Sequence, residues 1–191
     1  MNNCGIKAHQ IKPHMLYNEK FKNLVLYILE NDHYREEGIK KLNKLLYFID
    51  FYFYRKFERS ISGAQYAKAP MGPIVEKYKE IFLDLEHKGV LKQEDMIGQI
   101  IFRPKQKVDV SVFSSEEVDH VRDVLEKYGK LSSTELESIS HEQQPWILTE
   151  NYGDIIDPDL ALLIADQPEE EIEGENETLK KELVELANSV F

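Results

Sequence analysis

The sequence predicts a mainly α-helical fold of the α+β class: a compact helical domain with one small β-hairpin and a C-terminal amphipathic helix. Apolar side chains recur at helical spacing in several segments, two segments open with a Ser-x-x-Glu signature, and two short β-like segments flank a turn. Hydrophobic residues make up 42% and charged residues 31% of the 191 residues. Because this composition is typical of globular proteins, we expect most of the chain to fold.

Three helices are predicted in the first half of the chain. Residues 20–31 and 39–57 carry apolar side chains at helical spacing. Pro73, whose fixed φ suits the first turn of a helix, is expected to open a third helix that ends near Lys88. Gly89 would then supply the left-handed stop.

Two capping boxes predict the helices of the second half. Ser114 and Glu117 stand three residues apart, so that each side chain can accept a hydrogen bond from the other residue's backbone N–H. They predict a helix over 115–128. The pair Ser132 and Glu135 repeats the signature before a shorter helix.

Two further segments complete the predicted domain. Segments 90–94 and 99–103 flank a turn at 95–98 and predict the small hairpin. Farther on, the run 160–165 is apolar at every position and follows a proline-containing cap at 157–159. We therefore expect a buried helix there.

Negative charge is concentrated at the C-terminal end. Residues 150–191 contain thirteen acidic residues and two lysines, and they carry the whole net charge of −11. Residues 1–149 have a net charge of zero. We predict a flexible leader over 1–17, a domain over 18–166, and a tail over 167–191 with an acidic linker before an amphipathic helix. A basic partner complements such a tail, and a solubilising terminus is the alternative.

Composition also indicates the cellular compartment in which the protein is expected. A single cysteine, Cys4, excludes a disulfide framework and a multi-cysteine zinc site, which suits a reducing cytosol. The longest apolar runs have six residues, far short of the ~20 that cross a bilayer, and the N-terminus has no apolar signal region. We expect a soluble cytoplasmic protein without a membrane partner.

Catalytic signatures are scarce. His141-Glu142 opens like a zincin motif, but Pro145 occupies the position of the second histidine, and the six histidines show no ligand spacing. The sequence has no phosphate-binding glycine loop and no nucleophile elbow. We therefore expect no enzyme, no catalytic residue, no cofactor and no metal, and an uncharacterised enzyme is a minor alternative.

A DNA-binding regulator is a second minor alternative. The segment 115–141 has helix-turn-helix proportions, and the hairpin resembles a wing. The would-be recognition helix, however, carries Glu135 and Glu137 and no lysine or arginine, whereas major-groove reading relies on Arg, Lys, Asn or Gln. Direct nucleic-acid binding is not expected.

The long predicted helix has a second apolar face. Opposite its leucine and isoleucine stripe lie Tyr47, Phe51 and Tyr54, with Lys40 and Lys44 beside them. Tyrosine and basic residues are typical anchors of protein interfaces. We predict that this face binds a partner protein, and a helix packed on both sides is the alternative.

The tail contributes a second predicted contact. Leu179, Leu183, Leu186 and Val190 recur at steps of four, three and four residues and share one helical stripe. A helix of about 13–15 residues is marginal on its own. We therefore expect the stripe to dock on its own domain, on a second copy, or on the partner.

Three motifs occur in a distinctive order. They are a Lys-Leu-x-Lys-Leu-x-Tyr helix, a Gly-Pro pair followed by a tyrosine, and a Ser-His pair followed by Pro-Trp. Their residues here are Lys41, Leu42, Lys44, Leu45, Tyr47, Gly72, Pro73, Tyr78, Ser140, His141, Pro145 and Trp146. Together they resemble the Panacea domain of SocA-like antitoxins over roughly 20–165, with Met71 departing from the aromatic that is common before Gly-Pro.

The resemblance implies a bacterial or phage antitoxin of a type II toxin–antitoxin system, which masks a co-encoded toxin by direct binding. Its SocA-like branch implies an alternative, an adaptor that delivers the bound toxin to a protease. The implied partners are the cognate toxin and, for an adaptor, a protease, and a homo-oligomer is left open. Many relatives carry an attached helix-turn-helix domain that is not found here, so autoregulation of transcription is not implied.

The motif residues also have ordinary structural roles. Gly72 and Pro73 are expected to shape a turn, and His141 to lie at a helix C-terminus, where an imidazole favours the dipole. Trp146 is expected to be a core anchor whose indole N–H finds one acceptor.

Overall fold

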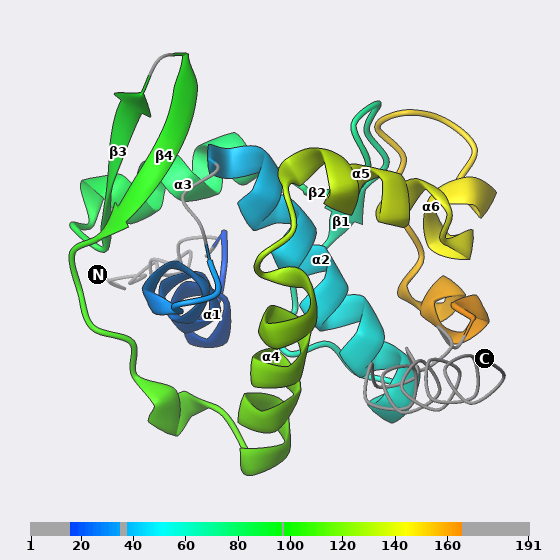
Figure 1. Ribbon diagram of the computed structural model, residues 1–191, viewed down its shortest axis with the longest axis horizontal. Coiled ribbons are helices and arrows are strands. Elements are labelled where there is room, and N and C mark those ends of the chain that lie inside the picture. The colour runs from blue at the N-terminus through cyan, green and yellow to red at the C-terminus, as the bar shows by residue number, and fades with distance from the viewer. Residues whose placement is uncertain (1–15, 35–37, 97, 166–191) are drawn as a thin grey trace, which may run out of the picture.

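The computed structural model describes residues 16–34, 38–96 and 98–165 (Figure 1). Helices dominate this part of the chain, and its strands form two small antiparallel pairs, β1 with β2 and β3 with β4. The structure confirms the mainly helical α+β class. The β1–β2 pair is an addition to the single hairpin that the sequence predicted.

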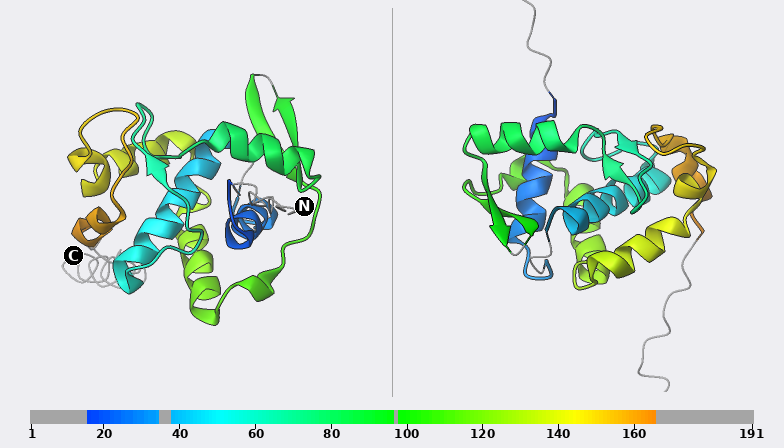
Figure 2. Two further views of the ribbon diagram at one scale, coloured as in Figure 1. Left: turned by 180° about the vertical axis from the view of Figure 1, so that it is seen from behind. Right: turned by 90° about the horizontal axis from the view of Figure 1, so that it is seen from above.

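The elements follow one another along the chain, with η denoting a 3-10 helix. They are α1 (Glu19–Glu30), α2 (Gly38–Phe57), β1 (Tyr66–Ala67), β2 (Ile74–Val75), α3 (Tyr78–His87), β3 (Leu91–Met96), β4 (Gln99–Pro104), η1 (Val110–Val112), α4 (Ser115–Tyr128), α5 (Ser133–His141), α6 (Gln144–Leu148) and η2 (Pro158–Leu163). Helix α2 runs through the middle of the molecule, with α1 on one side and η2 on the other (Figures 1 and 2).

Several local predictions are confirmed. Both capping boxes form, with Ser114 and Glu117 opening α4 and with Ser132 and Glu135 opening α5. The hairpin β3–β4 pairs as an antiparallel ladder. Gly89 follows the end of α3 with φ of +65°, the left-handed conformation that glycine adopts without strain.

The third predicted helix begins later than the sequence indicated. Pro73 does not open it, because Ile74–Val75 form β2 and pair with β1. The backbone N–H of Glu76 donates to Gln65 at 2.8 Å, which extends this pairing. Lys77 then adopts a left-handed conformation with φ of +55°, and α3 starts only at Tyr78.

The aromatic face of α2 is not a free surface. Tyr47 is 0% and Phe51 4% exposed, Lys44 is 3% exposed, and the two aromatic ring centroids lie 4.4 Å apart. The prediction of a partner-binding face is wrong for these three residues, because β2 and η2 pack against α2. Tyr54 is half-buried and Lys40 is exposed, so these two still reach the surface.

The apolar run 160–165 is only partly buried. Ala161 and Ile164 lie in the core, whereas Leu162 and Leu163 are 49% and 53% exposed. The prediction of a fully buried helix is therefore wrong. The segment forms the short 3-10 helix η2, which packs against α2 on one side and leaves its other side uncovered by the described residues.

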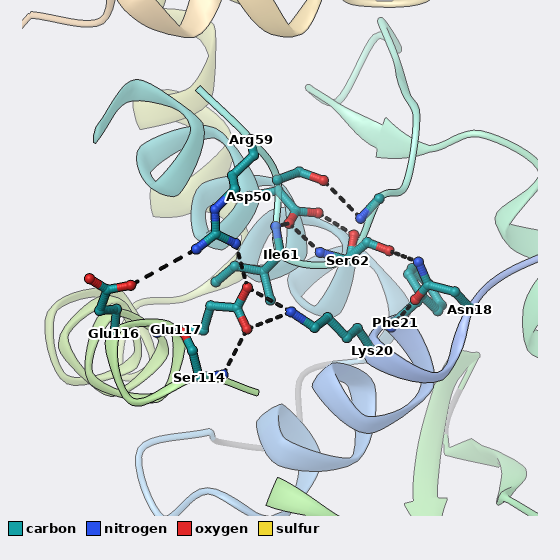
Figure 3. A network of polar contacts seen from close by, with 12 residues as sticks. Asn18, Lys20, Phe21, Asp50, Arg59, Ile61, Ser62, Ser114, Glu116 and Glu117 are labelled. Carbon is teal, nitrogen blue, oxygen red and sulfur yellow. Dashed lines mark hydrogen bonds and ion pairs between the residues drawn. The ribbon is translucent and has the colours of Figure 1, made fainter. Parts of the chain in front are cut away.

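A buried carboxylate joins α1, α4 and the segment after α2 (Figure 3). The side chain of Glu117 is 1% exposed, and Lys20 donates to both of its oxygens at 2.7 Å. Arg59 also donates to it at 2.7 Å, and the backbone N–H of Ser114 at 3.0 Å. Burial alone would raise the pKa of Glu117, but these hydrogen bonds outweigh it and the pKa is lowered.

We expect Glu117→Gln to make the stability of the protein less sensitive to acid. Because the pKa of Glu117 is lower in the folded protein, its ionisation stabilises the fold above the ordinary value of 4.5. That contribution is lost as pH falls through the folded pKa. Lys20 and Arg59 are partly exposed, so water can hydrate them in the variant. We therefore expect Glu117→Gln to lower the free energy of unfolding by ~1–3 kcal/mol at pH 7, and this difference from wild type should shrink toward pH 3.

Urea denaturation of both proteins between pH 3 and 7 measures this difference. Glu116→Gln is the matched control, because Glu116 is exposed and lies 4.0 Å from Arg59, and it should change stability by less than ~0.5 kcal/mol. A constant difference between wild type and Glu117→Gln at every pH would contradict the assignment.

A second buried carboxylate lies on α2 (Figure 3). Asp50 is 1% exposed and accepts hydrogen bonds from the backbone N–H groups of Ile61 and Ser62 at 2.9 and 2.8 Å. The hydroxyl of Tyr66 donates to it at 2.7 Å, and the hydroxyl of Ser62 donates as well. Burial raises the pKa of Asp50, while these four donors oppose the shift. The carboxylate thereby holds the segment between α2 and β1 against the core.

Candidate functional site

Side chains from three distant segments meet beside the C-terminal end of α5. Lys44 on α2 donates through its Nζ to the carbonyl oxygen of Pro73 at 3.1 Å. Gly72 is so closely packed that a Cβ there would lie 2.5 Å from the Ser140 Oγ and 2.6 Å from the Lys44 Nζ. Its φ of +87° also favours glycine. The turn therefore needs glycine at position 72, as expected from the sequence.

Burial lowers the pKa of two basic side chains at this site. The pKa of Lys44 falls to about 8, with the charge of Glu137 opposing the shift and that of Lys40 adding to it. Burial also lowers the pKa of His141, with Glu137 again opposing and the charges of Lys44 and Lys68 adding to the shift. The His141 imidazole is therefore neutral at pH 7, and its buried Nε2 has no hydrogen-bond partner among the described residues.

Trp146 connects this cluster to α6. Its ring stacks on His141 with centroids 4.0 Å apart, and the Nζ of Lys68 lies 4.4 Å from its ring centroid. The indole Nε1 donates to the carbonyl oxygen of Ala69 at 3.2 Å, which confirms the predicted acceptor, but Trp146 is half-buried and not the core anchor that the sequence predicted. We call Lys44, Gly72, Ser140, His141 and Trp146 the motif cluster.

The motif cluster fixes the orientation of α6. Because Pro145 is buried and Trp146 packs on His141, the next two residues of this short helix, Ile147 and Leu148, face away and are about half exposed. A hydrogen bond at its C-terminal end also stabilises α6, because Thr149 donates through Oγ1 to the carbonyl oxygen of Pro145 at 2.7 Å. In turn, Lys68 donates to the carbonyl oxygen of Thr149 at 2.6 Å.

Apolar side chains gather around α6 at one end of the molecule. Helix α6 packs against η2, and the segment between them closes the same end (Figure 1). Hydrophobic residues of these elements that are about half exposed or more form what we call the end surface: Ile147, Leu148, Tyr152, Leu162 and Leu163. Single exposed apolar residues are ordinary, but a group on adjacent elements is typical of a protein interface.

The structure brings only part of the predicted site to the surface. Of the aromatic face, Lys40 and Tyr54 remain accessible, and the hydroxyl of Tyr54 donates to Asp159 of η2. The tail residues lie outside the described part of the chain: Leu179, Leu183, Leu186 and Val190. Sequence reasoning missed the end surface, although the run at 160–165 was a signal for part of it.

No group of three or more His, Cys, Asp or Glu side chains in residues 16–34, 38–96 and 98–165 is placed to hold a metal ion. Within the same ranges, no helix is long and apolar enough to span a membrane.

Comparison with protein families gives the motif cluster a context. Residues 42–147 match the family model described as "Antitoxin SocA-like, Panacea domain". This chain belongs to that family. The matched range begins in α2 and ends in α6, so the Panacea domain includes the whole motif cluster. No curated protein and no solved structure matches the chain.

Membership confirms the resemblance seen in the sequence and supports an antitoxin role in general. The Panacea motifs are far apart in the chain but adjacent in the structure. Their shared role in this fold is to close the turn at Gly72 against α5 and to hold α6.

Proposed function

We propose that this Panacea-domain protein is an antitoxin that neutralises a co-encoded toxin by direct protein–protein binding, and that the end surface contacts the toxin. The observation that carries the proposal is the end surface itself, which is built on the motif cluster of an antitoxin family. Apolar and aromatic residues dominate the buried centre of protein interfaces.

The motif cluster supports this proposal because it fixes α6 before any partner arrives. A contact surface held in its bound conformation loses little entropy on association. The stripe Leu179, Leu183, Leu186 and Val190, together with Lys40 and Tyr54, stays a proposed addition to this contact.

The proposal is tested with a double variant of the end surface, Ile147→Ser with Leu148→Ser. Both side chains are about half exposed, so the variant should melt near the wild-type temperature. Loss of two anchors should weaken toxin binding by roughly 30-fold or more, which corresponds to ~2 kcal/mol. Growth rescue on co-expression with the adjacent toxin gene, and titration calorimetry of the purified pair, measure the effect.

Leu83→Ser with Val110→Ser is the matched control, because these residues are equally exposed on α3 and η1. It should bind the toxin like wild type. Equal losses in both double variants, or none in either, would contradict the proposed contact. Masking also predicts full rescue in a protease-deficient host, whereas an adaptor would lose its protection there.

A further inference from the structure

A second surface feature is a groove between the C-terminal half of α2 and α4. The groove has a volume of about 400 Å³. Its basic lining residues are Arg55, Lys56 and Lys127, its acidic one is Asp123, and Ala165 closes one wall. We call it the α2–α4 groove.

The α2–α4 groove carries a net positive charge. Lys56 and Lys127 are exposed, and neither has a carboxylate partner among the described residues. The carboxylate of Asp123 lies 3.8 Å from Arg122, which offsets part of its charge. His120 adds no charge at pH 7, because burial lowers its pKa and its Nε2 lies 3.0 Å from the carbonyl oxygen of Ile49.

Two tyrosines, Tyr52 and Tyr128, line the groove together with these cations. The rings of Tyr52 and Tyr128 stack with centroids 5.7 Å apart, and the hydroxyl of Tyr128 donates to that of Tyr52 at 3.0 Å. Both side chains are held by the core, so the groove is preformed. An acidic, extended peptide complements a preformed groove lined by basic and aromatic side chains.

The chain itself supplies such a peptide at this point. The described chain ends at Ala165, in the wall of the groove, and Asp166 follows directly. Residues 166–177 contain seven acidic side chains and no lysine or arginine. Six residues of extended chain span about 20 Å, so Glu169, Glu170 and Glu171 are within reach of the basic lining residues.

We propose that the acidic segment 166–177 binds in the α2–α4 groove of the same molecule, where its carboxylates pair with Lys56, Lys127 and Arg55. A short tether gives an effective concentration on the order of millimolar. The segment therefore outcompetes acidic ligands that approach in solution at lower concentration. Since the pairs lie at the surface, the contact weakens as salt rises. The proposal is independent of toxin binding.

Carbodiimide cross-linking of the full-length protein tests the contact, because it joins a lysine Nζ only to a carboxylate in direct contact. Equal amounts of unlabelled and 15N-labelled chain are mixed, and the cross-linked peptides are identified by mass spectrometry. We expect Lys56 and Lys127 to be joined to 166–177 within one chain, with at least about fivefold lower yield at 500 mM than at 50 mM salt.

The variant Lys56→Glu reverses the charge of one lysine of the groove, and its effect is measured as the cross-linking yield of the other, Lys127. Lys56→Glu should lower the cross-linking of Lys127 by about threefold or more, whereas Lys105→Glu should not, although it changes the net charge equally. Lys105 is exposed at the end of β4, away from the groove. Links between labelled and unlabelled chains would assign the groove to a second copy. If Lys56 and Lys127 were cross-linked to 166–177 in no higher yield than Lys105, the segment would not bind in the groove. Either result overturns the proposal.

Discussion

Tyr47→Ala is expected to destabilise the protein by ~3–5 kcal/mol, the usual cost of deleting a buried aromatic ring. The ring is 0% exposed and lies within 6 Å, centroid to centroid, of Phe48, Phe51 and Tyr66. For a domain of this size, such a loss lowers the melting temperature by on the order of 10 °C. Thermal melts of the purified variant measure it.

Two further variants make this result specific. The hydroxyl of Tyr47 is buried without a hydrogen-bond partner among the described residues, so Tyr47→Phe should be neutral or slightly stabilising. Tyr54→Ala should cost less than ~1 kcal/mol, because that side chain is half-buried at the surface. If Tyr47→Ala were stable but no longer bound the toxin, the aromatic face of α2 would be the toxin-binding surface that the sequence predicted.

Asp50→Ala is expected to cost a similar ~3–5 kcal/mol, because it leaves four hydrogen-bond donors in the core without an acceptor. Two of these donors are backbone N–H groups, of Ile61 and Ser62, which have no freedom to turn toward water. Urea denaturation should show a lower midpoint with an unchanged slope.

Ser62→Ala is the graded control for Asp50. It removes one hydroxyl donor to the carboxylate and leaves the backbone donors of Ile61 and Ser62 and the hydroxyl of Tyr66 in place. Its expected cost is ~1 kcal/mol. If Asp50→Ala were no more destabilising than Ser62→Ala, the carboxylate would not organise the segment between α2 and β1.

The helices were predictable to the extent that their signals are local. Ser114 with Glu117 and Ser132 with Glu135 placed the starts of α4 and α5 correctly, because a capping box involves only the first turn of its own helix. The start of α3 was misplaced, because Ile74 and Val75 pair with β1, and strand pairing depends on a second segment.

The candidate site was predictable only in part. The motif residues were visible in the chain, and their order indicated the Panacea family. Their convergence was not visible, because the contact between Gly72 and Ser140 joins segments 68 positions apart. The apolar run that contains Leu162 and Leu163 predicts a buried helix, but both residues belong to the end surface.

Local sequence was thus sufficient for the helical class, the capped helix starts and the family motifs, since each depends on neighbouring residues or on their order. Long-range packing was needed to tell core from surface. Tyr47 and Leu162 are both hydrophobic residues on helices, yet the first is enclosed by elements from elsewhere in the chain, whereas the second is left about half exposed by the described residues. Burial depends on which other segments cover a side chain, and that is a property of the tertiary structure.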